Sequence, residues 1–166
     1  MNFVLTDLDK TARHFLAAFL FLITIATTVG LFYIYETTSM TKDGVNARYN
    51  GSTITDEEFD IPDQYPKSIQ DLLLNTHNHL FGFAIIFFLV GGLFYFNSTI
   101  NGRWKYFLIV EPFISVFITF TFLWFLRFAH TAFVYIVFIA GVLTYLSLYL
   151  MISILVYELI IKTYQR

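Results

Sequence analysis

Three histidines in this chain have the chemistry to bind a haem or a metal ion. His77 and His79 lie at the start of one apolar stretch, and His130 lies directly before another. Imidazole is a common ligand of haem iron and of zinc and copper. A haem b with two histidine ligands needs one imidazole from each of two facing helices, at matching depth. Since His77 and His79 are about 200° apart on a helix, only one of them can pair with His130. We expect His79, with His77 as the alternative.

Other residues fit the same haem hypothesis. Gly82 follows His79 by three residues, and Gly141 follows His130 by eleven, so each glycine shares a helix face with its histidine. A face without a side chain would let a porphyrin approach, and the abundant phenylalanines would pack around it. Arg127 is placed to meet the haem propionates. The predicted cofactor is therefore haem b, with its iron bound by His79 and His130.

Two other interpretations of the histidines remain open. As polar residues at the membrane boundary, they can cap helix ends and bond loop carbonyl groups. They can also bind copper or zinc, with Asp71 or Asn75 nearby. The His-x-His spacing of His77 and His79 is not the usual i, i+4 chelating pair, so the metal interpretation is the weaker of the two.

Glu111 is the acid that lies deepest within an apolar stretch, and Pro112 follows it. An ionisable group inside a membrane helix is a functional candidate by default. With His14 on the same side, Glu111 could bind or relay a proton or contact a quinone head group. The interpretation that we favour from the sequence is structural: an ion pair with His14, Arg13 or Arg103.

Glu158 and Lys162 form the other notable pair of charges. They are four residues apart near the end of the last apolar stretch. On a helix this i, i+4 spacing brings a carboxylate and an ammonium group together. We expect a structural ion pair at the membrane surface.

The composition shows which elements must position these side chains. Of the 166 residues, 57% are hydrophobic and 20% aromatic, whereas 13% are charged; soluble domains carry roughly 25% charged residues. A net charge of −2 without a basic cluster argues against nucleic-acid binding. The absence of cysteine excludes disulfides, thiolate metal sites, iron–sulfur clusters and covalently attached haem.

Four apolar stretches are long enough to be membrane-spanning helices. A helix needs about 20 residues to cross the hydrocarbon core. The predicted spans are approximately residues 14–35, 74–97, 105–127 and 131–161. The fold class expected for residues 1–166 is therefore all-α: one integral membrane four-helix bundle in a lipid bilayer, with one long connection, residues 36–72.

The distribution of Lys and Arg predicts the orientation of the bundle. Six of these residues fall on the side of the termini: Lys10, Arg13, Arg103, Lys105, Lys162 and Arg166. Segment 36–72 falls on the other side and carries eight acids. Because positive residues favour the cytoplasmic side, we expect both termini in the cytoplasm and segment 36–72 outside.

The long connection is expected to form an irregular cap over the bundle, since it contains Gly51 and Pro66 among other turn residues. Its last residues indicate a helix start. Ser68, with Asp71 three residues later, resembles a capping box, and the helix should run from there to about Phe96.

Three segments carry a resemblance to a known group of proteins. They are Arg48-Tyr49-Asn50-Gly51, Lys67-Ser68 with Leu72-Leu73, and Thr76-His77-Asn78-His79. These segments resemble the RYxG outer loop and the KS…LL…THxH second-helix start of small bacterial four-span membrane proteins of unassigned function. The layout is also similar to that of four-helix membrane cytochromes b, which hold haem between helices and serve respiratory complexes. This chain has fewer histidines than they do, which allows one bis-histidine haem at most.

The leading functional hypothesis is a haem-b electron-transfer subunit of a redox complex in the bacterial inner membrane. It would associate with partner membrane subunits or with copies of itself. Electrons would pass to or from a quinone or a periplasmic carrier. One alternative is a non-catalytic accessory subunit, and another is an extracytoplasmic copper- or zinc-binding membrane protein. We expect a subunit of this kind rather than a stand-alone enzyme.

Overall fold

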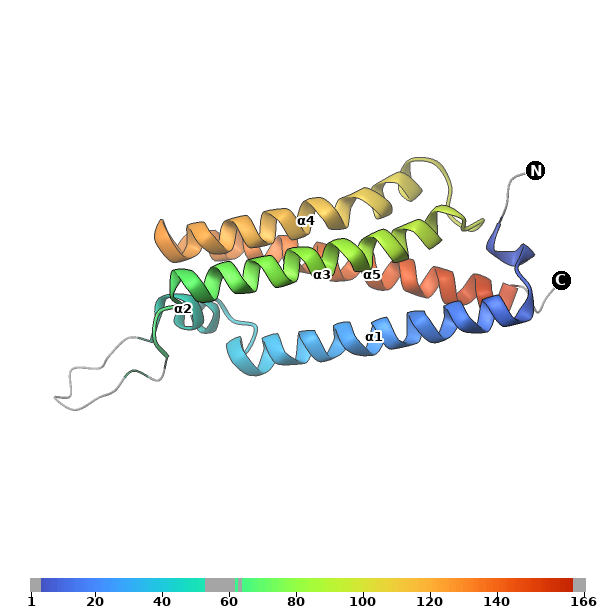
Figure 1. Cartoon of the computed structure of the whole chain (residues 1–166). Helices are drawn as coiled ribbons and strands as arrows, with labels where there is room; N and C mark the ends of the chain where they lie inside the picture. Colours follow the sequence, from blue (N-terminus) through green and yellow to red (C-terminus); the bar gives the residue numbers. More distant parts are fainter. Residues whose placement is uncertain (1–3, 53–61, 63, 163–166) are drawn as a thin grey trace.

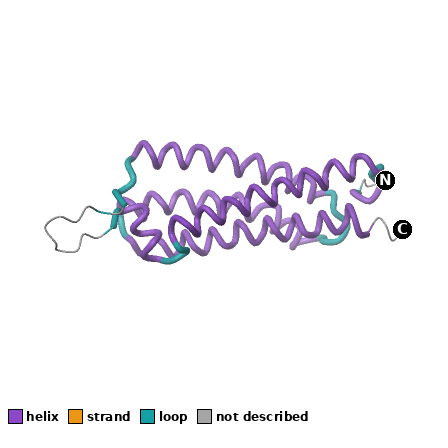
Figure 2. Tube along the Cα trace, turned by 90° about the horizontal axis from the view of Figure 1, so that it is seen from below, coloured by secondary structure: helices purple, strands orange, loops and turns teal. Residues whose placement is uncertain are grey.

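Four long helices lie side by side in the computed structural model, which describes residues 4–52, 62 and 64–162. The helices are α1 (Lys10–Thr38), α3 (Ile69–Tyr95), α4 (Gly102–Phe128) and α5 (Val134–Val156), and a π-helix, η3 (Tyr157–Lys162), continues α5. Figures 1 and 2 show a single elongated bundle. All four helices are long and apolar enough to cross a membrane. The prediction of an all-α bundle of four apolar helices is confirmed.

A short helix, α2 (Lys42–Asn50), lies across one end of the bundle (Figure 1). The sequence predicted an irregular cap here, and for these nine residues that prediction is wrong. The Thr41 side chain accepts a hydrogen bond from the Gly44 amide at 3.0 Å, which supplies the N-cap of the helix. The rest of the expected cap includes residues 53–61 and 63, which lie outside the described residues.

Apolar packing and a tight turn hold α2 in place. Val45 is buried in a cluster with Leu126 of α4 and Val134 of α5. Gly51 ends the helix with φ +90°, and a Cβ there would lie 2.9 Å from the Cδ of Pro66. Only glycine fits both the backbone angle and the close approach of the proline.

The start of α3 agrees with the sequence. Ser68 is its N-cap: the hydroxyl accepts from the Asp71 amide at 3.1 Å and donates to the Asp71 carboxylate at 2.9 Å. The helix ends at Tyr95, one residue before the predicted end.

The core lies mainly between α3, α4 and α5. Its fully buried large side chains include Phe87, Phe94, Leu148, Met151 and Leu155. Helix α1 is less buried than its neighbours. Of its most apolar 18-residue stretch, 11% is buried, against 39% for the corresponding stretches of α4 and of the last span. It packs against α2, α5 and η3.

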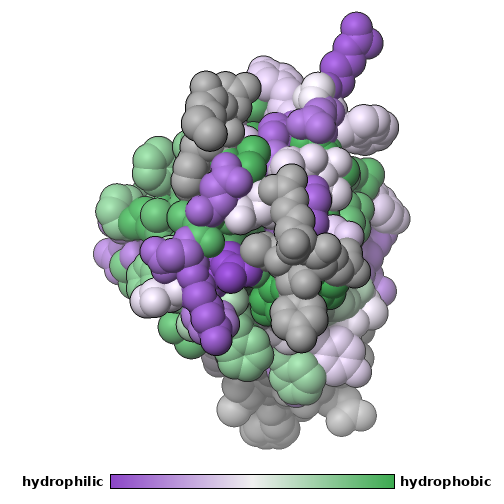
Figure 3. Space-filling model, turned by 90° about the vertical axis from the view of Figure 1, so that its right-hand side faces the viewer, coloured by the Kyte–Doolittle hydropathy of each residue, from purple (hydrophilic) through white to green (hydrophobic). Residues whose placement is uncertain are grey.

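The bundle has two different ends. The histidine end lies beside α2 and carries the first part of α3, with His77 and His79, and the α4–α5 connection, with His130. The terminal end carries both chain termini (Figure 1). Figure 3 views the molecule from the terminal end, where hydrophilic side chains gather among apolar ones. The orientation of these ends across the membrane stays a prediction.

Candidate functional site

His79 is exposed on α3 and bonds within its own helix. Its Nδ1 lies 2.9 Å from the Asn75 carbonyl oxygen, and its ring lies 5.2 Å from that of Phe120 on α4. Because a carbonyl oxygen only accepts, Nδ1 must carry the proton of this bond. In the neutral ring, the lone pair of His79 is then on Nε2. Histidines that bind metals often have this arrangement.

His130 has the opposite arrangement. It is the N-cap of η2, a 3₁₀ turn (Thr131–Phe133), and its Nδ1 accepts a hydrogen bond from the Ala132 amide at 3.0 Å. The neutral ring therefore carries its proton on Nε2. To bind iron through Nε2, His130 would have to move that proton to Nδ1 and give up the cap.

His77, the alternative ligand, is exposed and stacks on Phe81, one turn further along α3, at 6.4 Å. Across the described parts of the chain, no three His, Cys, Asp or Glu side chains form a group that could hold a metal ion. The contacts of the histidines are thus mostly with residues of their own helix or turn. Haem or metal binding at this end stays a prediction.

The remaining residues of the haem hypothesis are also at surface or structural positions. A Cβ placed on Gly82 or on Gly141 would meet no atom within 4 Å, so both glycines face open space. The Arg127 Nε donates to the Lys67 carbonyl oxygen at 3.1 Å, and the guanidinium lies 5.0 Å from the Phe128 ring. Arg127 therefore ties the end of α4 to the segment that leads into α3.

The Arg48-Tyr49-Asn50 motif forms a structural joint at the histidine end. Arg48 donates to the Tyr33 hydroxyl at 2.6 Å, and the Asn50 side chain donates to the Leu126 carbonyl oxygen at 3.3 Å. The Tyr49 carbonyl oxygen accepts from the Lys67 amide at 3.0 Å. Burial of the Tyr49 phenol raises its pKa, as expected of a side chain that serves packing. The motif connects α2 with α1, with α4 and with the segment before α3.

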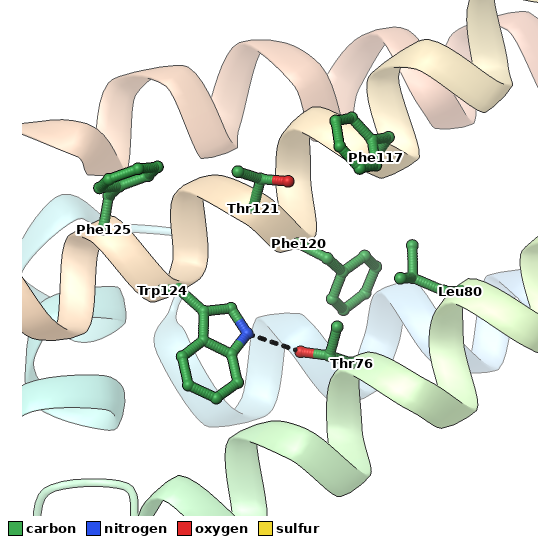
Figure 4. Close-up of a pocket in the computed structure, with 7 residues that line it drawn as sticks. All are labelled: Thr76, Leu80, Phe117, Phe120, Thr121, Trp124 and Phe125. Carbon is green, nitrogen blue, oxygen red and sulfur yellow. Dashed lines mark hydrogen bonds between the residues drawn. The ribbon is translucent and has the colours of Figure 1, made fainter.

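A shallow groove of about 280 Å³ lies between α3 and α4 near the histidine end (Figure 4). It is lined by Thr76, Leu80, Phe117, Phe120, Thr121, Trp124 and Phe125. Its polar side chains are Thr121, Thr76 and Trp124, and the Trp124 indole donates to the Thr76 hydroxyl at 3.1 Å. The aromatic walls provide an apolar surface and no reactive group.

Glu111 is buried between α4 and α5. Its carboxylate accepts hydrogen bonds from the Ser115 hydroxyl and, at 2.6 Å, from the Ser147 hydroxyl. The ion pair with His14, Arg13 or Arg103 that the sequence favoured is wrong: among the described residues, the only ion pair is the one between Glu158 and Lys162. His14 is exposed on α1. The sequence located the acid but missed both serines. The i, i+4 spacing of Glu111 and Ser115 was the available signal for Ser115, whereas Ser147 belongs to another helix.

Glu158 is fully buried at the terminal end, in the π-helix. Its Oε1 accepts from the Ser98 amide at 2.7 Å, the Ser98 hydroxyl at 2.8 Å and the Thr99 hydroxyl at 2.6 Å. Lys162 Nζ lies 3.3 Å from the same oxygen, so the predicted ion pair is confirmed. This carboxylate therefore connects the π-helix η3 with the α3–α4 connection. The sequence did not indicate that contact.

The comparisons with known proteins agree with this architecture. A family model described as a transmembrane helical domain matches residues 39–166, which include α2 to α5. Neither the curated proteins nor the solved structures contain a match to the chain. With its four long apolar helices, the chain is an integral multi-pass membrane protein, embedded in a lipid bilayer.

Proposed function

We propose that this chain, which belongs to a family of transmembrane helical domains, is a non-catalytic accessory subunit of a larger complex in a bacterial inner membrane. In this proposal both termini lie in the cytoplasm. The observation that carries it is the use of the polar side chains at the histidine end. His130 caps a turn, Arg127 holds the segment before α3 and Arg48 bonds Tyr33. Because these side chains hold turns and helix ends in place, their hydrogen bonds support a structural role for this end of the protein.

The surface of the bundle supports contacts with partner helices. Helix α1 is the least covered of the four spans. On α3 and α5, Gly82, Gly92 and Gly141 face open space. Small residues on a membrane helix let a second backbone approach closely, which strengthens helix–helix packing. We therefore assign partner contacts to α1 and to these open glycine positions.

The test is the mass of the protein in native membranes. The full-length chain is tagged, extracted in mild detergent and compared on native gels with its 19.4 kDa protomer. We expect a larger complex in the parent protein and its loss in Gly92→Leu. A side chain at Gly92 meets no atom of the protein itself, so the variant should fold.

The histidine variants provide the control. His79→Ala and His130→Ala should leave the complex intact, since neither side chain faces a partner in this proposal. Migration of the parent protein as a single protomer would contradict an accessory role. So would a complex that survives Gly92→Leu, Gly82→Leu and Gly141→Leu but dissociates when the histidines are replaced.

Haem-b electron transfer is the second candidate, and one observation favours it. The Nε2 of His79 is free to bind iron, and Gly82 beside it faces open space. His130 would have to release its cap to become the second ligand. This candidate predicts a haem signal that disappears in both His79→Ala and His130→Ala.

A further inference from the structure

Glu111 is an unusual residue for the middle of an apolar helix. It lies nine residues after the start of α4, about 14 Å along the axis, and its side chain is 7% exposed. Ser115, one turn further along α4, contacts one carboxylate oxygen, and Ser147 of α5 contacts the other at 2.6 Å. Both serines are buried. The three side chains form a small polar cluster across the α4–α5 interface.

The two serines behave differently from many other hydroxyl groups in these helices. Elsewhere, a hydroxyl donates to the carbonyl oxygen four residues earlier in its own helix. This bond is formed by Thr24, Thr27, Thr28, Thr37, Thr38, Thr119, Thr144 and Ser153. Ser115 and Ser147 donate to Glu111 instead. Each therefore has a second acceptor within reach of a side-chain rotation.

Among the described residues, no Lys, Arg or His side chain forms an ion pair with this carboxylate. Residues 80–94 of α3 contain no ionisable side chain, and Glu111 is the only one among residues 107–126 of α4. The titratable residues of α5 beside Ser147 are Tyr145 and Tyr149. Tyr145 packs its ring against Phe83 of α3, and Tyr149 bonds Thr28 of α1. The partners of the carboxylate are thus two neutral hydroxyl groups.

The spacing of the oxygen atoms indicates what the cluster can bind. The Ser147 oxygen lies 2.6 Å from the carboxylate, which is the distance of a short hydrogen bond to a charged acceptor. One hydrogen atom lies between these two oxygens, so the bond can be donated from either side.

We propose that Glu111, Ser115 and Ser147 form a proton-binding site at the α4–α5 interface. When the carboxylate is ionised, both hydroxyls donate to it. When it takes up a proton, the new O–H donates to the Ser147 oxygen. Ser147 then turns its own hydrogen to the Leu143 carbonyl, four residues earlier. Proton uptake thus reverses the direction of the hydrogen bond between the two helices.

Pro112 makes α4 adaptable at this point. It has no N–H to donate to the Leu108 carbonyl, so α4 lacks one backbone hydrogen bond beside Glu111. A helix that lacks such a bond can bend more easily when the side-chain bonds rearrange. The inference goes beyond the accessory role and does not depend on it.

The test is infrared difference spectroscopy of the full-length protein in lipid vesicles, between acidic and alkaline buffer. A protonated carboxyl group gives a C=O stretching band that an ionised one lacks. The exposed Asp and Glu residues give such bands as well, so the band that reports the cluster is the one present in the parent protein and lost in Glu111→Gln. Glutamine preserves the shape and the contacts with both serines, so the variant should fold.

Two further variants separate proton binding from a structural role. Glu158→Gln, at the other buried carboxylate, should leave the titrating band unchanged. Ser147→Ala should shift the band, since the hydrogen bond to the carboxyl group changes. The proposal is overturned if Glu111→Gln removes no titrating band, or if Ser147→Ala leaves the band of Glu111 unshifted.

Discussion

The histidines and the buried carboxylates form hydrogen bonds of opposite kinds. His79 and His130 are exposed, and their hydrogen bonds stay within one helix or one turn. Glu111 and Glu158 are buried, and their bonds join different parts of the chain. The role of an ionisable residue is therefore better indicated by where its hydrogen-bond partner lies in the chain than by whether the residue is a histidine or a glutamate. A local bond shapes one element, whereas a bond across elements holds the bundle together.

The largest effect should come from Glu158→Ala. This change removes the common acceptor of Ser98, Thr99 and Lys162 at the terminal end. Loss of one partner of a buried ion pair costs about 3–5 kcal/mol. The free energy of unfolding, measured in detergent by denaturant titration, should fall by that amount. Glu158→Gln should cost less, because its amide oxygen can still accept. Equal losses of stability in the two variants would show that the contact depends on the charge of Glu158 and not on its hydrogen-bond acceptor.

A smaller loss is expected for Ser147→Ala. The buried carboxylate of Glu111 then loses a hydroxyl donor from α5. An unsatisfied buried polar group costs about 1–3 kcal/mol. Ser153→Ala is the matched control on the same helix, since Ser153 is exposed and bonds only its own backbone. In the same detergent, Ser147→Ala should lower the free energy of unfolding more than Ser153→Ala does. Equal free energies would contradict the contrast between local bonds and bonds across elements.

The histidine end should respond least. His130→Ala removes the cap of a single 3₁₀ turn and should cost about 1 kcal/mol or less. His130→Asn should restore most of this loss, because Asn is a strong N-cap residue. The same unfolding assay applies. If Asn restores nothing, the ring of His130 has a role other than capping.

The sequence predicted most of the architecture, because hydrophobic length is a strong signal. It located four spans, the Ser68 cap of α3 and the pairing of Glu158 with Lys162. The spans depend on the composition of one continuous stretch, and the cap and the ion pair depend on neighbours within about four residues. The helix α2 escaped prediction because its nine residues are mostly polar, and Val45 is held by Leu126 and Val134 from distant parts of the chain.

The sequence predicted which residues are candidates for the site, but not the contacts that they make. A rare acid in an apolar helix marked Glu111, but its contact with Ser147 depends on how α4 packs on α5. The same limit applies to the contact of Glu158 with Ser98, which is 60 residues earlier. The histidines were prominent in the sequence because of their chemistry, yet their hydrogen bonds turn out to be local.

The most direct test of this account is the reduced-minus-oxidised absorption spectrum of the full-length protein, purified from haem-sufficient cells. If the histidines serve the local structure, the spectrum of the parent protein should show no haem b signal and should match that of His79→Ala with His130→Ala. A haem b signal in the parent protein that is lost in this double variant would contradict the account and establish the histidine end as a cofactor site.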